Sequence, residues 1–549
     1  MKHSVRRSAL FLLLNIVCLS NLTAGAPRLA VILVIDQLPY HVFASMHQNL
    51  VGGLKKLVQS GINFTNAYAP HGLPSTATGH AAFNTGTFAK DHGIIANSWY
   101  SDNGERIFAD CDNSPHTKIF GASDTMAGKS AHHLMVDGIS DTTIMYPSSG
   151  CANKVFALSL KSHPAIMCAG HLGKALWFDE QQGKFTSSHA FFEQLPQWLI
   201  QFNNDHIIPD SITWCPRHCF SSCFYKNVCP SARIDDLSLF ESPIKTHDKV
   251  NGIETYKNYL KTPQATQLLF DAARACIEAE LSCNREEQLI VWISVSSTDF
   301  IGHEFGTQSI PYVDLIYHID CQFKKFMRFV TRLVKSSDVV WILSSDHGSA
   351  PVPELLEQEG YHSAHRIKVT ELEDAIRKAA QHLNHDTTLS TTVSAPYVYI
   401  AKNNLNTIDA QKRNALFSTI QETLLKNACI KRTWTYEQLK NAVFDPYTPE
   451  YNLQQQLYPG RSGNIIFQTA PYCLVSKYTS GTTHESPYNY DTHVPLVMYQ
   501  KGFVERKIIN ETVLTLQVAP TIAHLMQVPK PSTCTFSMLP GIAGHEILI

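Results

Sequence analysis

The chain has 549 residues, of which only 17% are charged, and its formal net charge is −2. A chain of this length can bury a sizeable core, either as one large domain with insertions or as two to four units, and it has the size of an enzyme. The near-neutral charge excludes a long-range attraction to nucleic acid or to an anionic membrane, so we expect no nucleic acid polymer as partner and only local binding of anions.

The N-terminus has the features of a secretory signal peptide over residues 1–26. Lys2 and two arginines precede the apolar run 9–19, and small residues follow at 24–26. The apolar run is well short of the roughly 20 residues that a membrane-spanning helix needs. We therefore expect a mature chain without a membrane span, exported across the inner membrane to the periplasm or the extracellular space. A retained membrane anchor is the alternative.

Fourteen cysteines fit an oxidising compartment. Four of them lie close together, at Cys215, Cys219, Cys223 and Cys229. Their spacing does not match the paired C-x2-C knuckles of structural zinc sites, so we favour disulfide bonds over a zinc site in this cluster. The spacing does not fix the connectivity.

The first half of the chain begins with a clear strand. Residues 29–35 form a continuous β-branched run, as in a strand buried on both faces, and the run ends at Asp36. The elements expected after it are a helix at 53–60, a strand at 62–67, a helix at 76–85, and strands at 93–100, 154–160 and 165–169.

The second half repeats the pattern of a buried strand that ends at an acidic residue. The elements expected there are a helix at 264–281, a strand at 289–295, a helix at 311–334, strands at 338–343 and 396–400, a helix at 410–426, a strand at 494–498 and a helix at 519–526. Strands that alternate with helices predict a doubly wound, mostly parallel α/β sheet, in which ligands gather beyond the carboxyl ends of the strands.

Acidic residues and histidines cluster after these strand ends. They are Asp36, Asp299, His303, Asp346, His347 and, later in the chain, His484. Carboxylate oxygen and neutral imidazole are ligands that zinc accepts, and a set without cysteine suits catalytic metals that keep an open position. Taken singly, each residue is more often a helix cap or a packing histidine. Their joint placement favours a metal site, and six ligands suffice for two ions.

Five ordered motifs resemble those of the alkaline phosphatase superfamily, in its branch of type I phosphodiesterases and nucleotide pyrophosphatases. The motifs are VILVIDQL at 31–38, PSTATGH at 74–80 followed by NTG at 84–86 and HGIIAN at 92–97, SSTDFIGHEFG at 296–306, SSDHGS at 344–349, and THESPYNYDTHVPL at 483–496. The resemblance extends from about residue 29 to 525, and the chain is most similar to the phosphate-irrepressible alkaline phosphatases.

This resemblance implies two zinc ions, and the chemistry of the ligands also admits Mn or Fe. It implies that one ion is bound by Asp299, His303 and His484, and the other by Asp36, Asp346 and His347. It also implies that Thr76 is the nucleophile, in contact with the second ion, and that Asn97 donates to a phosphate oxygen. A threonine hydroxyl is a poor nucleophile near neutral pH unless a cation stabilises its alkoxide, and a helix start favours phosphate.

Two positions leave questions open. Thr78 stands where the family has a proline, two residues after the nucleophile, which puts the rigidity of the turn in doubt. His493 competes with His484 for the last ligand position. We favour His484 because it follows the turn at Gly481, whereas His493 enters a predicted strand.

The segment 159–163 resembles the K-x-R segment with which phosphate-irrepressible alkaline phosphatases neutralise a monoester dianion. Lys161 is kept, but His163 replaces the arginine. Histidine offers one part-charged donor where arginine offers a fixed, charged fork. The sequence therefore predicts a phosphomonoesterase with a weakened clamp and activity on diesters. The alternatives are a nucleotide pyrophosphatase/phosphodiesterase and, in another class, a non-catalytic metal-dependent binding protein.

The motifs also suggest a domain organisation. We expect residues 27–110, 286–360 and 471–549 to form the α/β core, and residues 111–285 and 361–470 to be two inserted cap regions around a small phosphate ester substrate. The sequence does not indicate an oligomeric state.

Overall fold

The computed structural model of the chain describes most of residues 26–542. The positions it does not describe in that range are 124, 148–151, 227, 230–236, 251–252, 282–283, 285, 382–389 and 447. The signal peptide expected at 1–26 therefore lies almost entirely outside the described residues. Among the helices that are described, none is both long enough and apolar enough to cross a bilayer.

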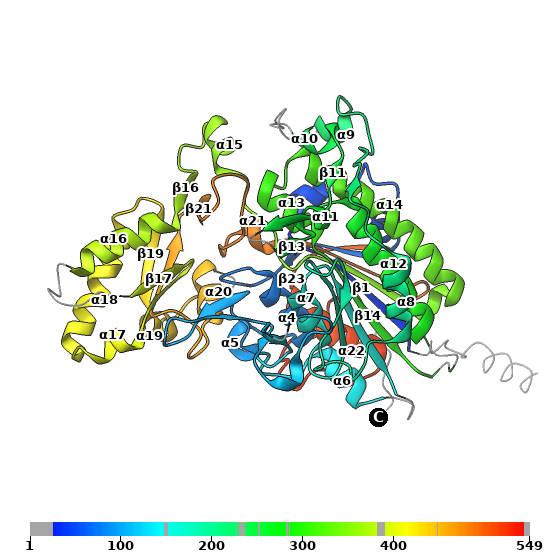
Figure 1. The fold of residues 1–549 in the computed structure, drawn as a ribbon, viewed down its shortest axis with the longest axis horizontal. Helices are drawn as coiled ribbons and strands as arrows, with labels where there is room; N and C mark the ends of the chain where they lie inside the picture. The colour runs from blue at the N-terminus through cyan, green and yellow to red at the C-terminus, as the bar shows by residue number, and fades with distance from the viewer. Residues whose placement is uncertain are drawn as a thin grey trace, which may run out of the picture.

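A nine-stranded sheet forms the centre of the molecule (Figure 1). Its strands, in spatial order, are β23 (Lys507–Leu514), β2 (Ile62–Tyr68), β22 (His493–Tyr499), β15 (Val339–Ser344), β1 (Leu29–Ile35), β14 (Leu289–Val295), β7 (Lys154–Ser159), β8 (Lys174–Asp179) and β9 (Lys184–Thr186). All run in one direction except β22 and β9, which are antiparallel to their neighbours. The predicted mostly parallel α/β sheet is confirmed.

Helices cover both faces of this sheet because β1 is apolar at every position. Leu33 and its alternate neighbours pack into one buried cluster with α3 (Gly53–Ser60), α12 (Pro263–Glu280) and α14 (Ile310–Leu333). Ile32 and its alternate neighbours pack into a second cluster on the other face, with α4 (Thr76–Thr85), α7 (Ser162–Ala169) and α22 (Val518–Met526). The doubly wound arrangement follows from this two-sided burial.

A smaller lobe, drawn in yellow at the left of Figure 1, lies beside the core. Its four-stranded sheet has the order β17 (Thr391–Ser394), β18 (Tyr397–Ile400), β20 (Ile465–Thr469) and β19 (Ile430–Thr435). The helices α16 (Val369–Gln381) and α18 (Ala410–Leu425) pack on this sheet around a hydrophobic cluster of their own. This lobe contains most of the segment 361–470.

The segment 111–285 is more deeply joined to the core than the sequence pattern suggested. Its strands β7, β8 and β9 form one edge of the central sheet, and β7 pairs directly with β14. The core therefore extends into this segment and is not limited to 27–110, 286–360 and 471–549. The sequence pattern hid this because the three strands are short and are separated by a helix and by turns.

Two predicted strands are wrong. The run 165–169 belongs to helix α7, whose first turn contains Pro164 and which ends at Gly170 with φ 67°. A short apolar run does not distinguish a buried strand from a buried helix, and the flanking Pro and Gly are the helix signals that decide. Of 93–100, only β3 (Ser98–Tyr100) is a strand. The rest is a buried loop whose carbonyl groups bond to side chains, so it needs no partner strand.

Gln456, which caps α20 (Pro449–Gln455), connects that loop to the loop before Thr76. Its side-chain oxygen accepts from Gly72 N at 3.2 Å, and its amide donates to Leu73 O at 3.1 Å and to Ile95 O at 2.6 Å. The side chain is fully buried. It therefore satisfies three backbone groups that water cannot reach.

Replacing Gln456 with leucine should lower the free energy of unfolding by about 2–4 kcal/mol, because a similar volume remains but the buried backbone groups lose their partners. Urea unfolding followed by fluorescence measures this change. Gln421→Leu is the control and should change the free energy little, because Gln421 lies near the surface, where its amide donates to Gln438. Equal stabilities of the two variants would contradict the role given to Gln456.

Candidate active site

The ends of three adjacent strands bring three carboxylates together. Strand β1 lies between β15 and β14. Asp36 follows β1 directly, Asp346 lies just beyond β15, and Asp299 lies in the first turn of α13 (Ser297–Phe305), which follows β14. All three carboxylates are buried. Parallel strands end at the same edge of a sheet, so three acidic residues that are distant in sequence meet there.

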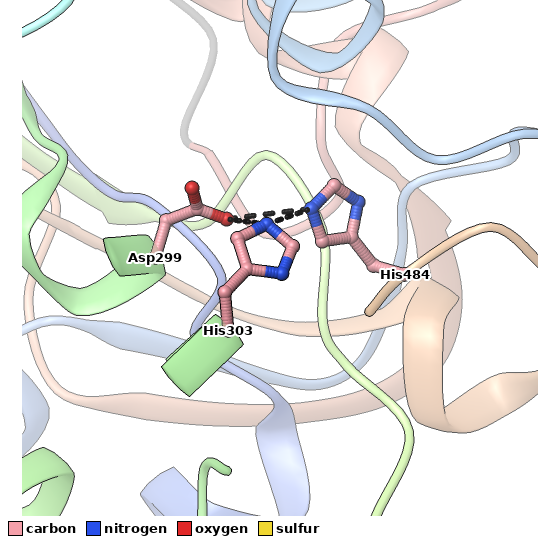
Figure 2. A group of neighbouring side chains, drawn as sticks. All are labelled: Asp299, His303 and His484. Atoms are coloured by element: carbon pink, nitrogen blue, oxygen red, sulfur yellow. Dashed lines mark hydrogen bonds and ion pairs between the residues drawn. The ribbon is translucent and has the colours of Figure 1, made fainter. Parts of the chain in front are cut away.

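Asp299, His303 and His484 form the first cluster (Figure 2). The Asp299 Oδ1 atom lies 3.2 Å from His303 Nε2 and 3.3 Å from His484 Nε2, and the two Nε2 atoms are 3.3 Å apart. Ligands about 2.0–2.1 Å from a tetrahedral zinc ion stand about 3.3–3.4 Å from one another. The cluster therefore has the spacing of three ligands of one metal ion.

Asp36, Asp346 and His347 form the second cluster. The Nε2 atom of His347 lies 3.5 Å from Asp36 Oδ1 and 3.5 Å from Asp346 Oδ2. The other oxygen of Asp346 accepts hydrogen bonds from the backbone N–H groups of Gln37 and His347 at 3.2 and 3.0 Å. One oxygen of Asp346 is thus fixed by the backbone, and the other faces the cluster.

Each histidine of the two clusters is oriented by a backbone carbonyl. The Nδ1 atom of His303 bonds to Thr482 O, that of His484 to Pro74 O, and that of His347 to Gly348 O, each at 2.9 Å. A carbonyl can only accept, so these contacts place the proton on Nδ1 and leave the Nε2 lone pair for a metal. Burial lowers the pKa of His347 to about 4 and that of His484 to about 3, which keeps both rings neutral.

Several acceptor atoms of the two clusters are buried without a hydrogen-bond partner in the part of the chain that the structure describes. Oδ1 of Asp36, Oδ1 of Asp299, Oδ2 of Asp346 and Nε2 of His347 are buried and have no hydrogen-bond partner within the described residues. Burial and the neighbouring carboxylates raise the pKa of Asp36, and burial raises that of Asp346 to about 7. Unpaired buried acceptors are costly, so this donor set fits bound metal ions.

Lys161 lies between the two clusters. Its Nζ atom is 2.8 Å from Asp36 Oδ2 and 2.5 Å from Asp299 Oδ2. The Oδ1 atoms of the same carboxylates contact the cluster histidines. Lys161 directly precedes α7. Its ammonium group lies 5.0 Å from the ring centre of Phe300. The charges of Asp299 and Asp36 outweigh burial and raise the pKa of Lys161, so the side chain is a cation.

Thr76 is the first residue of α4, and its backbone neighbours contact both clusters. Its carbonyl accepts from His80 Nδ1 at 2.8 Å, and that nitrogen is also 3.4 Å from Asp346 Oδ2. Two residues before Thr76, the carbonyl of Pro74 accepts the hydrogen bond from His484 Nδ1. A Cβ atom on Gly79 would stand 2.6 Å from the carbonyl oxygen of Asp346, so glycine is what lets the helix approach the metal ligands this closely.

The neighbourhood of Thr76 is held by two polar side chains. Asn97 Oδ1 accepts from the backbone N–H of Ala77 at 2.8 Å, which fixes the amide beside the helix start. The hydroxyl of Thr78 lies 2.9 Å from that of Ser75 and donates to Ile94 O at 3.0 Å. The threonine that replaces the family's proline therefore restrains the turn by hydrogen bonds in place of a ring.

His163 lies near Lys161 but makes a different contribution. Burial lowers the pKa of His163 to about 4 even though the Asp110 carboxylate raises it. Its Nε2 atom is buried and has no hydrogen-bond partner among the described residues. The ring is therefore neutral at physiological pH and adds no positive charge to that of Lys161.

His493 is not part of either cluster. Its Nε2 atom bonds to Thr65 O at 2.8 Å, and its ring stacks between Tyr40 and Tyr68 with ring centres 4.2 and 4.7 Å apart. The structure therefore brings His484, and not His493, to the first cluster.

Sequence reasoning assigned no role to three residues that support the strand ends. Gln37 adopts φ 62°, its N–H bonds to Asp346, and its carbonyl accepts from Tyr312 OH at 2.6 Å. The Thr298 hydroxyl donates to Asp36 O at 2.5 Å. Gln37 and Thr298 lie inside the quoted motifs, so their position could have indicated a role near the carboxylates. Tyr312 lies in α14, outside every quoted motif, and nothing in the sequence indicates its contact.

A third group of potential ligands, Asp137, Asp141 and His171, lies away from these clusters. Asp141 is buried but satisfied, because one oxygen accepts from Gly138 N and the other from the N–H groups of His171 and Leu172 at 2.8 Å each. Its hydrogen bond to His171 raises the pKa of that histidine. We interpret this group as a structural ion pair.

This ion pair should make stability depend on pH. The folded-state pKa of His171 is raised, so the stabilisation is fully present below the unfolded pKa of about 6.5 and is lost as pH rises through the folded-state value. The Tm of wild type should therefore exceed that of His171→Gln most clearly at about pH 6, and less at about pH 8.5. A Tm difference that is independent of pH would contradict this interpretation.

Comparisons with known proteins identify a matching family and several relatives. The family described as type I phosphodiesterase / nucleotide pyrophosphatase matches residues 30–493. Alkaline phosphatase PhoV of Synechococcus elongatus is 26% identical, over 93% of this chain and 92% of its own length. Alkaline phosphatase PafA of Elizabethkingia meningoseptica is 23% identical, over 94% of this chain and 95% of its own length.

A solved structure has the same fold. The crystal structure of wild-type alkaline phosphatase PafA matches with a TM-score of 0.78 at 20% sequence identity, covering 95% of this chain and all of that chain. The similarity therefore includes both the central sheet and the segments that were expected to be insertions.

Proposed function

Because the chain belongs to the type I phosphodiesterase / nucleotide pyrophosphatase family and is a hydrolase of phosphate esters, we propose that it cleaves phosphate monoesters through a phosphothreonine at Thr76, with two zinc ions. The observation that carries this proposal is the position of Thr76 between the two clusters. Pro74 on one side is bonded to His484 of the first cluster, and His80 on the other side contacts Asp346 of the second.

The six ligands would hold the two ions as two sets of three. They are Asp299, His303 and His484 for one ion, and Asp36, Asp346 and His347 for the other. Bound there, the ions would supply Lewis acidity to the attacking hydroxyl and to the leaving oxygen. The ligand set does not distinguish Zn from Mn or Fe by itself, although the three-ligand spacing favours a tetrahedral ion.

The reaction then proceeds in two displacements at phosphorus. The Thr76 hydroxyl oxygen bonds to phosphorus as the bond to the alcohol oxygen breaks, and the alcohol leaves with that electron pair and a proton. Water next displaces the threonine oxygen, which releases phosphate and restores the hydroxyl. The start of α4 favours phosphate oxygens through its N–H groups and dipole. The Asn97 amide, held by Ala77 N, keeps its NH₂ group for a nonbridging oxygen.

Lys161 favours monoesters over diesters. A monoester dianion brings one more negative charge than a diester, and Lys161 is the cation that lies between the clusters. His163 adds no positive charge, so the discrimination between monoesters and diesters depends on Lys161 alone. We therefore propose a weaker selectivity for monoesters than a lysine–arginine pair would give. A pocket of about 270 Å³ lined by Lys161, His163, Trp177 and Phe300 offers space for the organic group.

The enzyme acts, in this proposal, in the periplasm or the extracellular space. The N-terminal sequence and the number of cysteines support export. The segments 111–285 and 361–470 surround the substrate in this proposal. The first of them also contributes strands β7, β8 and β9 to the central sheet.

Replacing Thr76 with alanine should lower kcat for p-nitrophenyl phosphate by on the order of 10⁴-fold or more, because the nucleophile is removed. Thr76→Ser, which keeps a hydroxyl, should retain much of the rate. Zinc content measured in parallel separates loss of the nucleophile from loss of the metal site. Alanine activity within tenfold of wild type would contradict a covalent role for Thr76.

Replacing Lys161 with alanine should lower kcat/KM for p-nitrophenyl phosphate roughly 10²-fold more than kcat/KM for bis-p-nitrophenyl phosphate, since one charge contact is lost from the dianion. Lys154→Ala, at the start of the strand that leads to Lys161, is the control and should leave both values near wild type. Equal losses on both substrates would favour the alternative, a nucleotide pyrophosphatase/phosphodiesterase.

A further inference from the structure

Two cysteines of the smaller lobe lie side by side although they are distant in the sequence. Cys429 directly precedes β19, and Cys473 begins β21 (Cys473–Ser476). The backbone N–H of Ala470 donates to Cys429 O at 2.7 Å, and the N–H of Cys473 donates to Ala470 O at 3.1 Å. Ala470 thus joins both cysteines through two consecutive hydrogen bonds, which fixes their backbones next to each other.

Their side chains point into the same hydrophobic cluster. Cys429 is 5% exposed and Cys473 is 3% exposed, and both pack in the core of the smaller lobe. The Cys473 thiol donates to Ser363 O at 3.4 Å, and the two cysteine side chains also interact with each other. This interaction lowers the pKa of Cys429 and raises that of Cys473. Two cysteine side chains that interact within one buried cluster need little movement to bond.

We propose that Cys429 and Cys473 form a disulfide bond in the mature protein. This inference goes beyond the proposed function, because neither sulfur takes part in the reaction at Thr76. It also gives one specific pairing, which the spacing of the fourteen cysteines does not reveal.

The bond forms by thiol–disulfide exchange. The Cys429 thiolate attacks the disulfide of an oxidised low-molecular-weight thiol such as glutathione disulfide, and one glutathione thiolate leaves. The Cys473 sulfur, after losing its proton, attacks the Cys429 sulfur of the mixed disulfide and displaces the second glutathione. In total, two protein thiols lose two protons and two electrons, and one glutathione disulfide becomes two thiols.

The bond would tie the smaller lobe to the segment that delivers a metal ligand. Strand β21 pairs in parallel with β16 (His365–Lys368), and the chain then runs on to His484. From β16, Arg366 donates to Gly481 O at 2.7 Å, and the next carbonyl, of Thr482, orients His303. Fixing Cys473 to Cys429 therefore restrains the strand that leads into this loop.

Peptide mapping tests the pairing directly. The purified full-length chain is equilibrated in a mixture of glutathione and glutathione disulfide, alkylated in denaturant without reductant, and digested for mass spectrometry. The expected result is a peptide pair that joins Cys429 to Cys473 and separates on reduction. Alkylation of both cysteines in the unreduced sample would overturn the proposal.

Thermal unfolding gives a second readout. Closing this loop restricts the unfolded chain, so the double variant Cys429→Ser with Cys473→Ser should melt about 5 °C below oxidised wild type. Dithiothreitol should lower the wild-type Tm by the same amount and leave that of the variant unchanged. Cys111→Ser, at a position where the thiol contacts Asn113, is the control and should melt like wild type in both conditions. A wild-type Tm that does not respond to dithiothreitol would count against the bond.

Discussion

Three carboxylates buried beside a single lysine are the constraint on which the site depends. Asp36, Asp299 and Asp346 stand at the ends of adjacent strands, and Lys161 is the cation placed between two of them. An ionised carboxylate in a low-dielectric interior is strongly unfavourable unless it is paired. Burial raises the pKa of both Asp36 and Asp346, as expected of carboxylates that are incompletely paired. Cations bound by the two clusters would complete the pairing. Backbone carbonyls hold the Nδ1 atoms of His303, His347 and His484, which leaves the Nε2 atoms free to bind such cations.

The fold creates this constraint by burying β1 on both faces. Helices pack on both faces of the sheet, and the neighbours β15 and β14 run parallel to β1. The three acidic residues after these strands therefore lie at the same edge of the sheet. The same edge receives the start of α4, where Gly79 permits the close approach that sets Thr76 beside the ligands. The start of α4, with Thr76, and the two clusters of potential metal ligands thus lie at one sheet edge.

Much of this was predictable from local patterns. The continuous apolar runs before Asp36, Asp299 and Asp346 identify buried parallel strands, and their shared direction implies that the acidic ends meet. The short runs were less informative: residues 165–169 form a helix because Pro164 and Gly170 bound it, and apolarity alone did not reveal that. Tertiary contacts between distant segments were beyond prediction, such as the placement of Lys161 on two carboxylates and the support of Ile95 by Gln456.

Metal content tests the central claim most directly. Inductively coupled plasma mass spectrometry of the purified, folded chain, dialysed against metal-free buffer, should find about two zinc ions per chain, as expected for two three-ligand sites with open positions. A folded, metal-free chain that still hydrolyses phosphate esters at the full rate would contradict the account, because the buried carboxylates would then have no need of the cations that we infer.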